Sequence, residues 1–420
     1  MSIACVDIGS TYTKAALVEL PTGRLLATAQ APTTLDDVVT GVLAATAGFP
    51  DAPVIACSSA GGGLRLAVVG YEELISAEAG HRAALSAGAR VVHVAAGRLD
   101  DGALQKLRAV DPDVVLLVGG TDGGEESVLR HNAGALASSL PSVPIVLAGN
   151  VAVRDEVTAL LRDAGLPVRP ADNVLPDIGR LAPESARAAI REVFLEHVIG
   201  GERLSTDPRL RRWVRAVTPD AVLEGVALLA RLRTGAEAPG VLVLDVGGAT
   251  TDVYCVPDPD AEQASLGREA VGVPARRRTV EGDLGVFSSV ADLRASAAAE
   301  RLSVEEGPLA LGGAAATVAL RRHLRAEAAY GPGGAGARGV GLVVLSGGVF
   351  RHAEPRALDG VVARLAADRG GAGPVVDGTD VVVDSRYVLA AAGLLAAEHP
   401  EAAAGLLEVL ASGSVPPWRA

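Results

Sequence analysis

Lysine and aromatic residues are scarce in this chain. Aromatics make up 3% of the 420 residues, and lysine occurs only at Lys14 and Lys106, so arginine supplies the remaining positive charge. With hydrophobic residues at 49%, the cores must therefore be built from Ala, Val and Leu. The arginine-rich stretches 203–215 and 276–278 lack the interleaved aromatics of a nucleic-acid groove, so we interpret them as solvated faces.

Cysteine is rare as well, and long apolar runs are missing. The three thiols, Cys5, Cys57 and Cys255, are an odd and scattered set that fits neither a disulfide framework nor a zinc site and favours a reducing cytoplasm. The apolar run 388–397 falls short of the roughly 20 residues that a membrane span needs. A formal charge of −12 disfavours nucleic acid or an anionic membrane as the main partner. No basic leader precedes an apolar stretch at the N-terminus, so we expect no signal peptide and a soluble, cytoplasmic protein.

One stretch joins two strands by a glycine-rich turn with an acid on each side. The apolar runs 241–244 and 253–256 have strand length, and Asp245 ends the first of them. The turn residues are Gly247, Gly248, Ala249, Thr250 and Thr251. Glycine lets a ligand approach the backbone, and the amides with the two threonine hydroxyls form a donor-rich nest for phosphate oxygens. Asp245 is placed to hold the accompanying magnesium ion. An ordinary glycine-rich hairpin would show the same pattern.

A second hairpin repeats this pattern at the N-terminus. Asp7 ends a strand-like run, and Lys14 lies in the strand that follows the turn. The small or hydroxyl-bearing residues between them include Gly9, Ser10, Thr11 and Thr13. A compact ammonium is a point-charge phosphate binder that arginine does not replace freely. Because lysine is so rare here, we interpret Lys14 as a ligand contact rather than a solvated surface charge.

A third segment, 341–350, is a buried-type strand that runs into Gly347 and Gly348, a turn that could lie against a flat base. In order, the three segments resemble the two phosphate loops and the adenosine loop of the actin, heat-shock chaperone and sugar kinase superfamily of ATP-binding proteins. The resemblance implies an α/β protein with a two-lobed, actin-like ATPase (ribonuclease H-like) fold.

Strand-like and helix-like segments alternate from 90 to 176, which favours parallel strands with crossover helices in a flavodoxin-like α/β insertion. Asp122 lies in the loop after the central strand, where open α/β sheets bind ligands, and it is either a site residue or a helix cap. The only asparagines, Asn132, Asn150 and Asn173, fall in this unit and suggest a polar site or an interface.

The length of the chain allows two or three domains. We divide it into a first half of the actin-like ATPase fold (1–89), the flavodoxin-like insertion (90–176), a helical segment (177–240) and a second half of the ATPase fold (241–420). Glu281 and Asp283, which flank a glycine in the second half, are either metal or partner contacts or ordinary turn formers.

Five blocks of sequence narrow the resemblance to one family. Residues 7–14, 117–124, 131–133, 148–150 and 245–252 together look like the glutamate mutase (methylaspartate mutase) accessory family of the MutL type. The resemblance implies an ATP-binding, chaperone-like reactivating factor that releases damaged cobalamin from an adenosylcobalamin-dependent mutase. It also implies roles for individual residues: Asp7 and Asp245 as magnesium-side carboxylates, residues 9–14 and 247–251 as phosphate loops, and Gly347 with Gly348 as the adenosine contact.

Three functions stay open from the sequence. The first is an ATP-hydrolysing reactivating factor that uses ATP and Mg²⁺ and could form a homodimer. The second is a small-molecule kinase of the same fold, in which Asp122 or Asp252 would deprotonate a substrate hydroxyl. The third is a scaffold that binds nucleotide without hydrolysing it. The unit 90–176 lacks the Asp-x-His-x-x-Gly motif of cobalamin-binding domains, and we hypothesise that it imitates the small cobalamin subunit of the mutase and docks on the large one.

Overall fold

The part of the chain that the structure describes forms three five-stranded sheets with covering helices. The computed structural model describes residues 1–412 except for 35, 61–63, 73–76, 78, 81–82, 85–88, 141, 200–203, 234, 237–239, 258–275 and 329–338. Two of the sheets share one topology, and the third is entirely parallel.

The first sheet has the strand order β10-β4-β1-β2-β3. Its strands are β1 (Ser2–Ile8), β2 (Tyr12–Glu19), β3 (Leu25–Pro32), β4 (Val54–Ser58) and β10 (Val214–Val217). The first three are antiparallel neighbours joined by short turns, whereas β4 lies parallel to β1 and β10 parallel to β4. Helices α1 (Val38–Thr46) and α7 (Pro208–Trp213) belong to the same lobe.

The second sheet repeats this arrangement as β13-β12-β11-β14-β15. Its strands are β11 (Gly240–Val246), β12 (Thr251–Val256), β13 (Arg277–Glu281), β14 (Val340–Ser346) and β15 (Asp380–Val383). Again three antiparallel strands are followed by two parallel ones. The helices of this lobe are α10 (Val290–Ala299), α11 (Pro308–Ala328), α12 (Gly348–Arg351), α13 (Pro355–Ala366) and α14 (Gly373–Val376).

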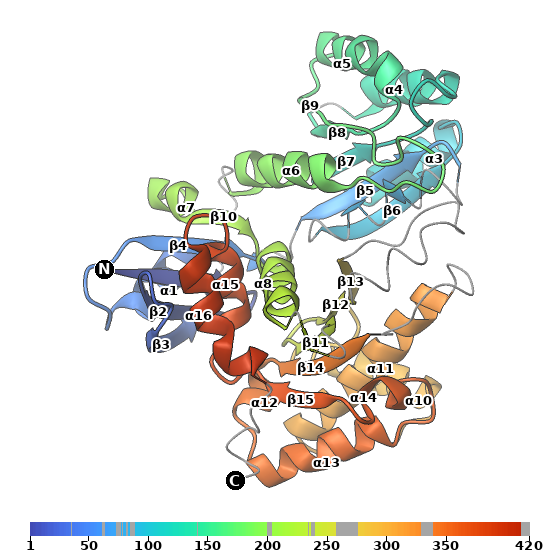
Figure 1. Cartoon of the computed structure of the whole chain (residues 1–420). Helices are drawn as coiled ribbons and strands as arrows, with labels where there is room; N and C mark the ends of the chain where they lie inside the picture. The colour runs from blue at the N-terminus through green and yellow to red at the C-terminus, as the bar shows by residue number, and fades with distance from the viewer. Residues whose placement is uncertain are drawn as a thin grey trace.

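Two crossed helices join the lobes. Helix α8 (Thr218–Leu232) follows the last strand of the first sheet and α15 (Val388–Leu395) follows the last strand of the second, and the pair packs side by side between the sheets with α16 (Pro400–Ala411) (Figure 1). The backbones touch, since a Cβ on Gly393 would lie 1.8 Å from the carbonyl oxygen of Ala221. Two ribonuclease H-like halves around crossed helices form the two-lobed, actin-like ATPase fold that the sequence predicts.

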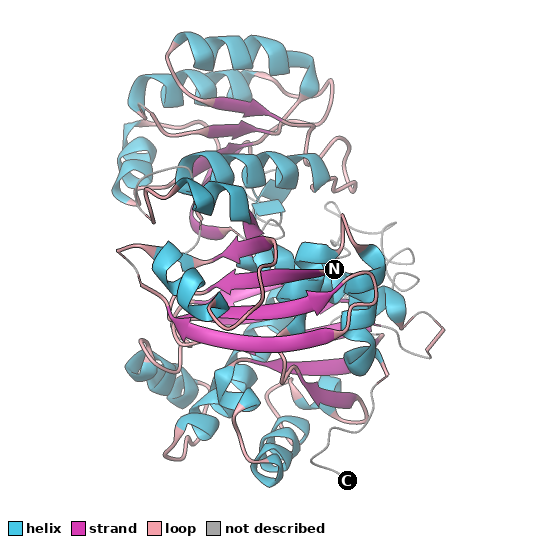
Figure 2. Ribbon diagram, turned by 90° about the vertical axis from the view of Figure 1, so that its left-hand side faces the viewer, coloured by secondary structure: helices cyan, strands magenta, loops and turns pink. Residues whose placement is uncertain are grey.

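The third sheet is inserted between β4 and β10 of the first lobe, and it lies above the two-lobed body in Figure 2. Its order β6-β5-β7-β8-β9 corresponds to 2-1-3-4-5 along the chain, which is the flavodoxin-like order. The strands are β5 (Arg65–Gly70), β6 (Arg90–Ala96), β7 (Val114–Leu117), β8 (Ile145–Leu147) and β9 (Val168–Pro170). The helices are α3 (Asp101–Ala109), α4 (Ser127–Ser139), the 3-10 helix η3 (Val151–Val153), α5 (Arg154–Asp163), α6 (Glu184–Val193) and the π-helix η4 (Phe194–Ile199).

The parallel sheet extends beyond the range 90–176. Strand β5, which pairs with both β6 and β7, lies at 65–70, in the stretch that we expected to belong to the first ATPase half. Pairing between distant strands, which the local pattern does not show, brings β5 into this sheet. Among the described helices, none combines the length and apolarity that crossing a membrane requires.

Candidate functional site

The turns of the two hairpins have the same backbone geometry. In the first, the amide of Gly9 donates to the carbonyl oxygen of Tyr12 at 3.1 Å, and in the second, Gly247 donates to Thr250 at 2.9 Å. A Cβ on Gly9 would lie 2.8 Å from its partner carbonyl, and one on Gly247 would lie 2.9 Å from its own. Both distances are shorter than real Cβ contacts, so both turns require glycine at the same place.

The two hairpin tips face each other across the lobes. A Cβ placed on Gly248 would lie 3.1 Å from the hydroxyl oxygen of Thr11. Strand register then puts two polar pairs side by side at the strand ends, Asp7 opposite Lys14 and Asp245 opposite Asp252. We call this arrangement the interlobe site; it comprises the two tips and the charged pairs behind them.

Lys14 is the cation of the interlobe site. Its Nζ lies 3.7 Å from Oδ2 of Asp7 and 3.9 Å from the ring centroid of Tyr387, a residue of the second lobe. Burial lowers the pKa of Lys14, but Asp7, Tyr387 and Asp245 together outweigh burial and raise the pKa above its usual value. The ammonium therefore stays charged at neutral pH, as a phosphate contact requires.

The two carboxylates differ in their surroundings. Oδ1 of Asp7 accepts a 2.6 Å hydrogen bond from the hydroxyl of Thr218, and the thiol of Cys57 lies 3.8 Å away. Burial raises the pKa of Asp245 to about 6; Lys14 counteracts this increase and the neighbouring Asp252 adds to it. Asp245 is therefore a buried carboxylate whose charged form is disfavoured.

These carboxylates fit a magnesium ion held together with a nucleotide. Within the described part of the chain, no group of three or more His, Cys, Asp or Glu side chains could hold a metal alone. Mg²⁺ bound with a nucleotide usually takes one or two carboxylates, with phosphates and waters as the other ligands, so Asp7 and Asp245 suffice. A divalent cation would also stabilise the charged form of Asp245, which burial disfavours.

Not every predicted hydroxyl faces the space between the tips. Thr13 and Thr251 occupy equivalent positions and are fully buried. The hydroxyl of Thr13 bonds that of Thr33 at 3.0 Å, and Thr251 donates to the carbonyl oxygen of Leu284 at 2.7 Å. These two hydroxyls hold the turns in shape, whereas Ser10 is exposed and Thr11 partly exposed on the first tip.

The third predicted segment lies beside the second hairpin. Gly347 has a φ of +111°, and a Cβ on it would lie 2.1 Å from the carbonyl oxygen of Val246. Gly348 begins α12 with no atom within 4 Å of its Cβ position, so open space lies next to its backbone. Gly347 therefore has a steric reason to be glycine, whereas Gly348 leaves room for a ligand.

Asp122 lies in the parallel unit, outside the interlobe site. Its Oδ1 accepts from the amide of Val151 at 3.2 Å and from Nδ2 of Asn173 at 2.9 Å, so it caps the short helix η3. The three asparagines are buried and bond the backbone of neighbouring loops: Asn132 bonds Gly97 and Leu99, Asn150 bonds residues 123–125 and Ala152, and Asn173 bonds Gly120 and Leu175. Their amides therefore hold loops in place.

Sequence reasoning missed several residues of the site. Thr218, Cys57 and Tyr387 come from segments without a local phosphate-binding pattern, and only the fold brings them to Asp7 and Lys14. Tyr387 has a φ of +55°, which is unusual for a residue other than glycine. Glu281 and Asp283, which the sequence analysis interpreted as metal or partner contacts or as turn formers, both form ion pairs with Arg322.

Comparison with known proteins agrees with the family resemblance. The model of the MutL protein family matches residues 3–306 and 305–410. Protein MutL from Clostridium tetanomorphum is 36% identical over 299 residues, which are 69% of this chain and 65% of that relative. The chain thus spans less than two thirds of the relative's length.

The solved structures that are similar to this chain share little sequence identity with it. A putative N-acetylmannosamine kinase from Listeria monocytogenes shares 12% identity, with 98% of this chain and 100% of that one covered and a TM-score of 0.30. An ATP-dependent caprolactamase from Pseudomonas jessenii shares 13%, with 94% and 70% covered and a TM-score of 0.39. Because the family model covers nearly the whole chain, the chain belongs to the MutL protein family.

Proposed function

We propose that this protein is an ATP-binding accessory factor of an adenosylcobalamin-dependent mutase such as glutamate mutase. In this proposal it hydrolyses ATP and couples the resulting closure and opening of its lobes to the release of damaged cobalamin. Membership of the MutL family supports the accessory role. The geometry of the interlobe site supports the nucleotide.

One observation carries the proposal. Two glycine turns of the same geometry, one from each sheet, meet tip to tip with a carboxylate behind each and one charged lysine between them. An isolated glycine-rich hairpin has no need of a matching partner. Two matched turns would bring backbone N–H donors from both lobes together, which suits a chain of phosphates.

Each group would have a separate task. The backbone amides of the two tips and the Lys14 ammonium would bind phosphate oxygens, while Asp7 and Asp245 would hold Mg²⁺, which supplies charge neutralisation at the transferred phosphoryl group. The hydrogen bond from Thr218 fixes the orientation of the Asp7 carboxylate. The open space beside Gly348 would receive the adenosine. Catalysis would rest on positioning and electrostatic stabilisation.

The kinase alternative needs a carboxylate that can accept a proton from a substrate hydroxyl, and both acids that the sequence analysis named for this role have other hydrogen-bond partners. Oδ1 of Asp252 accepts from Nε of the buried Arg278 at 2.8 Å, and its Oδ2 accepts from the hydroxyl of Thr250 at 3.2 Å. Asp122 caps a helix in the parallel unit. Because both carboxylates have structural partners, we favour hydrolysis, in which the attacking group is water.

The test is phosphate release from ATP with magnesium, measured with the full-length protein alone and with a cobalamin-inactivated mutase. We expect turnover that the mutase stimulates and that Asp245→Ala abolishes. The exposed acid Asp292 in α10 provides a control, since Asp292→Ala should leave turnover unchanged. Nucleotide binding without turnover would favour a scaffold, and turnover only with an added acceptor would favour a kinase.

We also propose that the parallel unit docks on the large subunit of the mutase in place of its small cobalamin subunit. The flavodoxin-like strand order supports this idea. If it is correct, the full-length protein and the small subunit compete for the large subunit in a binding assay. Simultaneous binding of both would contradict it.

A further inference from the structure

The first turn of α8 connects the interlobe site to the parallel unit. Thr218, the first residue of α8, donates its hydroxyl to Asp7 at 2.6 Å. Two residues later, Asp220 accepts from Nη2 of Arg187 at 2.8 Å and from Nε of Arg191 at 2.9 Å. Both arginines belong to α6, which follows the parallel sheet in the chain. One helical turn thus binds the site on one side and α6 on the other.

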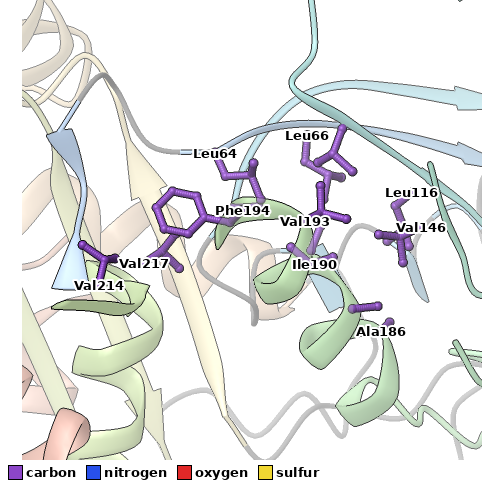
Figure 3. Close-up of a cluster of buried hydrophobic side chains, with 14 of the residues drawn as sticks. Leu64, Leu66, Leu116, Val146, Ala186, Ile190, Val193, Phe194, Val214 and Val217 are labelled. Atoms are coloured by element: carbon purple, nitrogen blue, oxygen red, sulfur yellow. The ribbon is translucent and has the colours of Figure 1, made fainter. Parts of the chain in front are cut away.

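Helix α6 forms part of the core of the parallel unit. Figure 3 shows Ala186, Ile190 and Val193 of α6 beside Leu66, Leu116 and Val146, which lie on three neighbouring strands of the parallel sheet. Phe194, directly after α6, reaches toward Val214 and Val217 of β10 in the first lobe. A shift of α6 must therefore move the parallel sheet with it, since close-packed interiors transmit displacements.

The contact between α8 and α6 is a charge network centred on one buried carboxylate. Asp220 is 2% exposed, and Arg187 also donates to Glu224, one turn further along α8, at 3.0 Å. Arg276, just before β13 of the second lobe, pairs with the same Glu224. Breaking the pairs of Asp220 would leave its buried charge uncompensated, so α6 and the first turn of α8 move together.

A second contact runs from the other hairpin. Asp252, opposite Asp245 in the second hairpin, binds the buried Arg278, and Nη1 of Arg278 donates to the carbonyl oxygen of Ala89 at 3.4 Å. Ala89 immediately precedes β6 of the parallel sheet. Both hairpins of the interlobe site are therefore connected to the parallel unit, each through a charged group.

We propose that nucleotide binding at the interlobe site and the orientation of the parallel unit are coupled through Thr218 and Asp220 on one side and Asp252 and Arg278 on the other. This inference rests on the proposed nucleotide function. Thr218 acts as a positioning residue, since its hydroxyl donates to the Asp7 carboxylate. Coupling is reciprocal, so a partner that binds the parallel unit changes nucleotide affinity by the same factor.

The test is hydrogen–deuterium exchange of the full-length protein with and without a non-hydrolysable ATP analogue and magnesium, with analogue affinity measured separately by calorimetry. We expect the analogue to change the exchange rates of amides in α6 and β5 by about 5-fold or more in the wild type. In Asp220→Asn the analogue should still bind, but the change in α6 should fall below about 2-fold. Asp368→Asn is the matched control, since Asp368 is also a buried carboxylate paired with an arginine, Arg321, but lies in the second lobe. It should retain the full response.

Substitutions of Thr218 separate positioning from folding. Thr218→Val removes the hydroxyl that orients Asp7, so the response of α6 and the magnesium-dependent part of the affinity should both be lost, and Thr218→Ser should restore both. A wild-type protein that binds the analogue without any response in α6 overturns the coupling and leaves the proposed function intact. An equal response in Asp220→Asn and wild type overturns it as well. Absence of nucleotide binding in the wild type overturns both proposals.

Discussion

Replacing Lys14 tests the phosphate-binding role most directly. Its ammonium lies 3.7 Å from Asp7 and is charged, because nearby carboxylates raise its pKa. A hydrogen bond to a charged group contributes about 1.5–3 kcal/mol. Lys14→Gln should therefore weaken ATP binding by about 10- to 150-fold. The loss should lie toward the upper end, because Asp7 and Asp245 would then repel the phosphates without a cation between them.

The chain contains its own control for this experiment. Lys106, the only other lysine, lies exposed in the last turn of α3. Lys106→Gln should bind ATP with wild-type affinity in the same calorimetric titration with magnesium. Adenosine, which lacks phosphates, should bind equally well to all three proteins. Equal ATP affinities for Lys14→Gln and Lys106→Gln would refute the assignment of Lys14.

Amine acylation gives an independent readout of the same side chain. Only the unprotonated amine reacts, and the pKa of Lys14 is raised by its carboxylate neighbours, so Lys14 should be labelled more slowly than the exposed Lys106. ATP should slow labelling at Lys14 further and leave Lys106 unchanged. Mass spectrometry of the two lysine-containing peptides measures both rates.

Three further substitutions test the fold and the site. Gly393→Ala should destabilise the protein by about 1–3 kcal/mol in urea unfolding, because its Cβ would lie 1.8 Å from the Ala221 oxygen at the helix crossing. Gly347→Ala should cost about 1–3 kcal/mol for its positive φ and weaken ATP binding in calorimetry, since the loop beside the second hairpin must shift. Burial raises the pKa of Asp368, but the interactions with Arg321 and the hydrogen bonds from the amides of Ala372 and Gly370 together outweigh burial and hold the pKa below its usual value. The Asp368 carboxylate therefore contributes its full stabilisation above its unfolded-state pKa, near 3.8, and this stabilisation is lost as the pH falls through the lower folded-state pKa. Asp368→Asn should therefore reduce the loss of stability below about pH 4.

Each of these substitutions has a defined contrary outcome. Gly360→Ala in α13 is the control for the glycine variants, because no atom lies within 4 Å of its Cβ position and the change should stabilise by about 0.4–1 kcal/mol. If Gly393→Ala behaves like Gly360→Ala, the close helix crossing is wrong. An unchanged ATP affinity in Gly347→Ala would exclude this turn from the site. An acid-unfolding curve of Asp368→Asn parallel to the wild type would show that the ion pair contributes nothing.

Local sequence patterns were sufficient to predict those parts of the site that lie within a single hairpin. The turns at Gly9 and Gly247 require glycine for steric reasons that act within four residues, so the sequence pattern predicts both. The recognition of the family and the actin-like fold, which rested on three such segments in order, are confirmed by the family match and the duplicated sheet topology.

Other predictions failed or stayed incomplete because they depended on distant contacts. Strand β5 belongs to the parallel sheet through pairing with β6 and β7, which its own sequence does not reveal. The asparagines, interpreted as a polar site or an interface, hold loops from within. Asp122, interpreted as a site residue or a helix cap, accepts from the first amide of η3 and lies outside the interlobe site.

The sequence by itself determined the secondary structure of the hairpins, the need for glycine in their turns and the acid behind each tip, since these follow from backbone sterics and strand periodicity over a few residues. Only the tertiary structure decided which residues surround the acids. Thr218 reaches Asp7 across 211 positions of the chain, and Tyr387 reaches Lys14 from the second lobe. Packing of two lobes and an inserted sheet around crossed helices sets these contacts, and no pattern within a single segment encodes them.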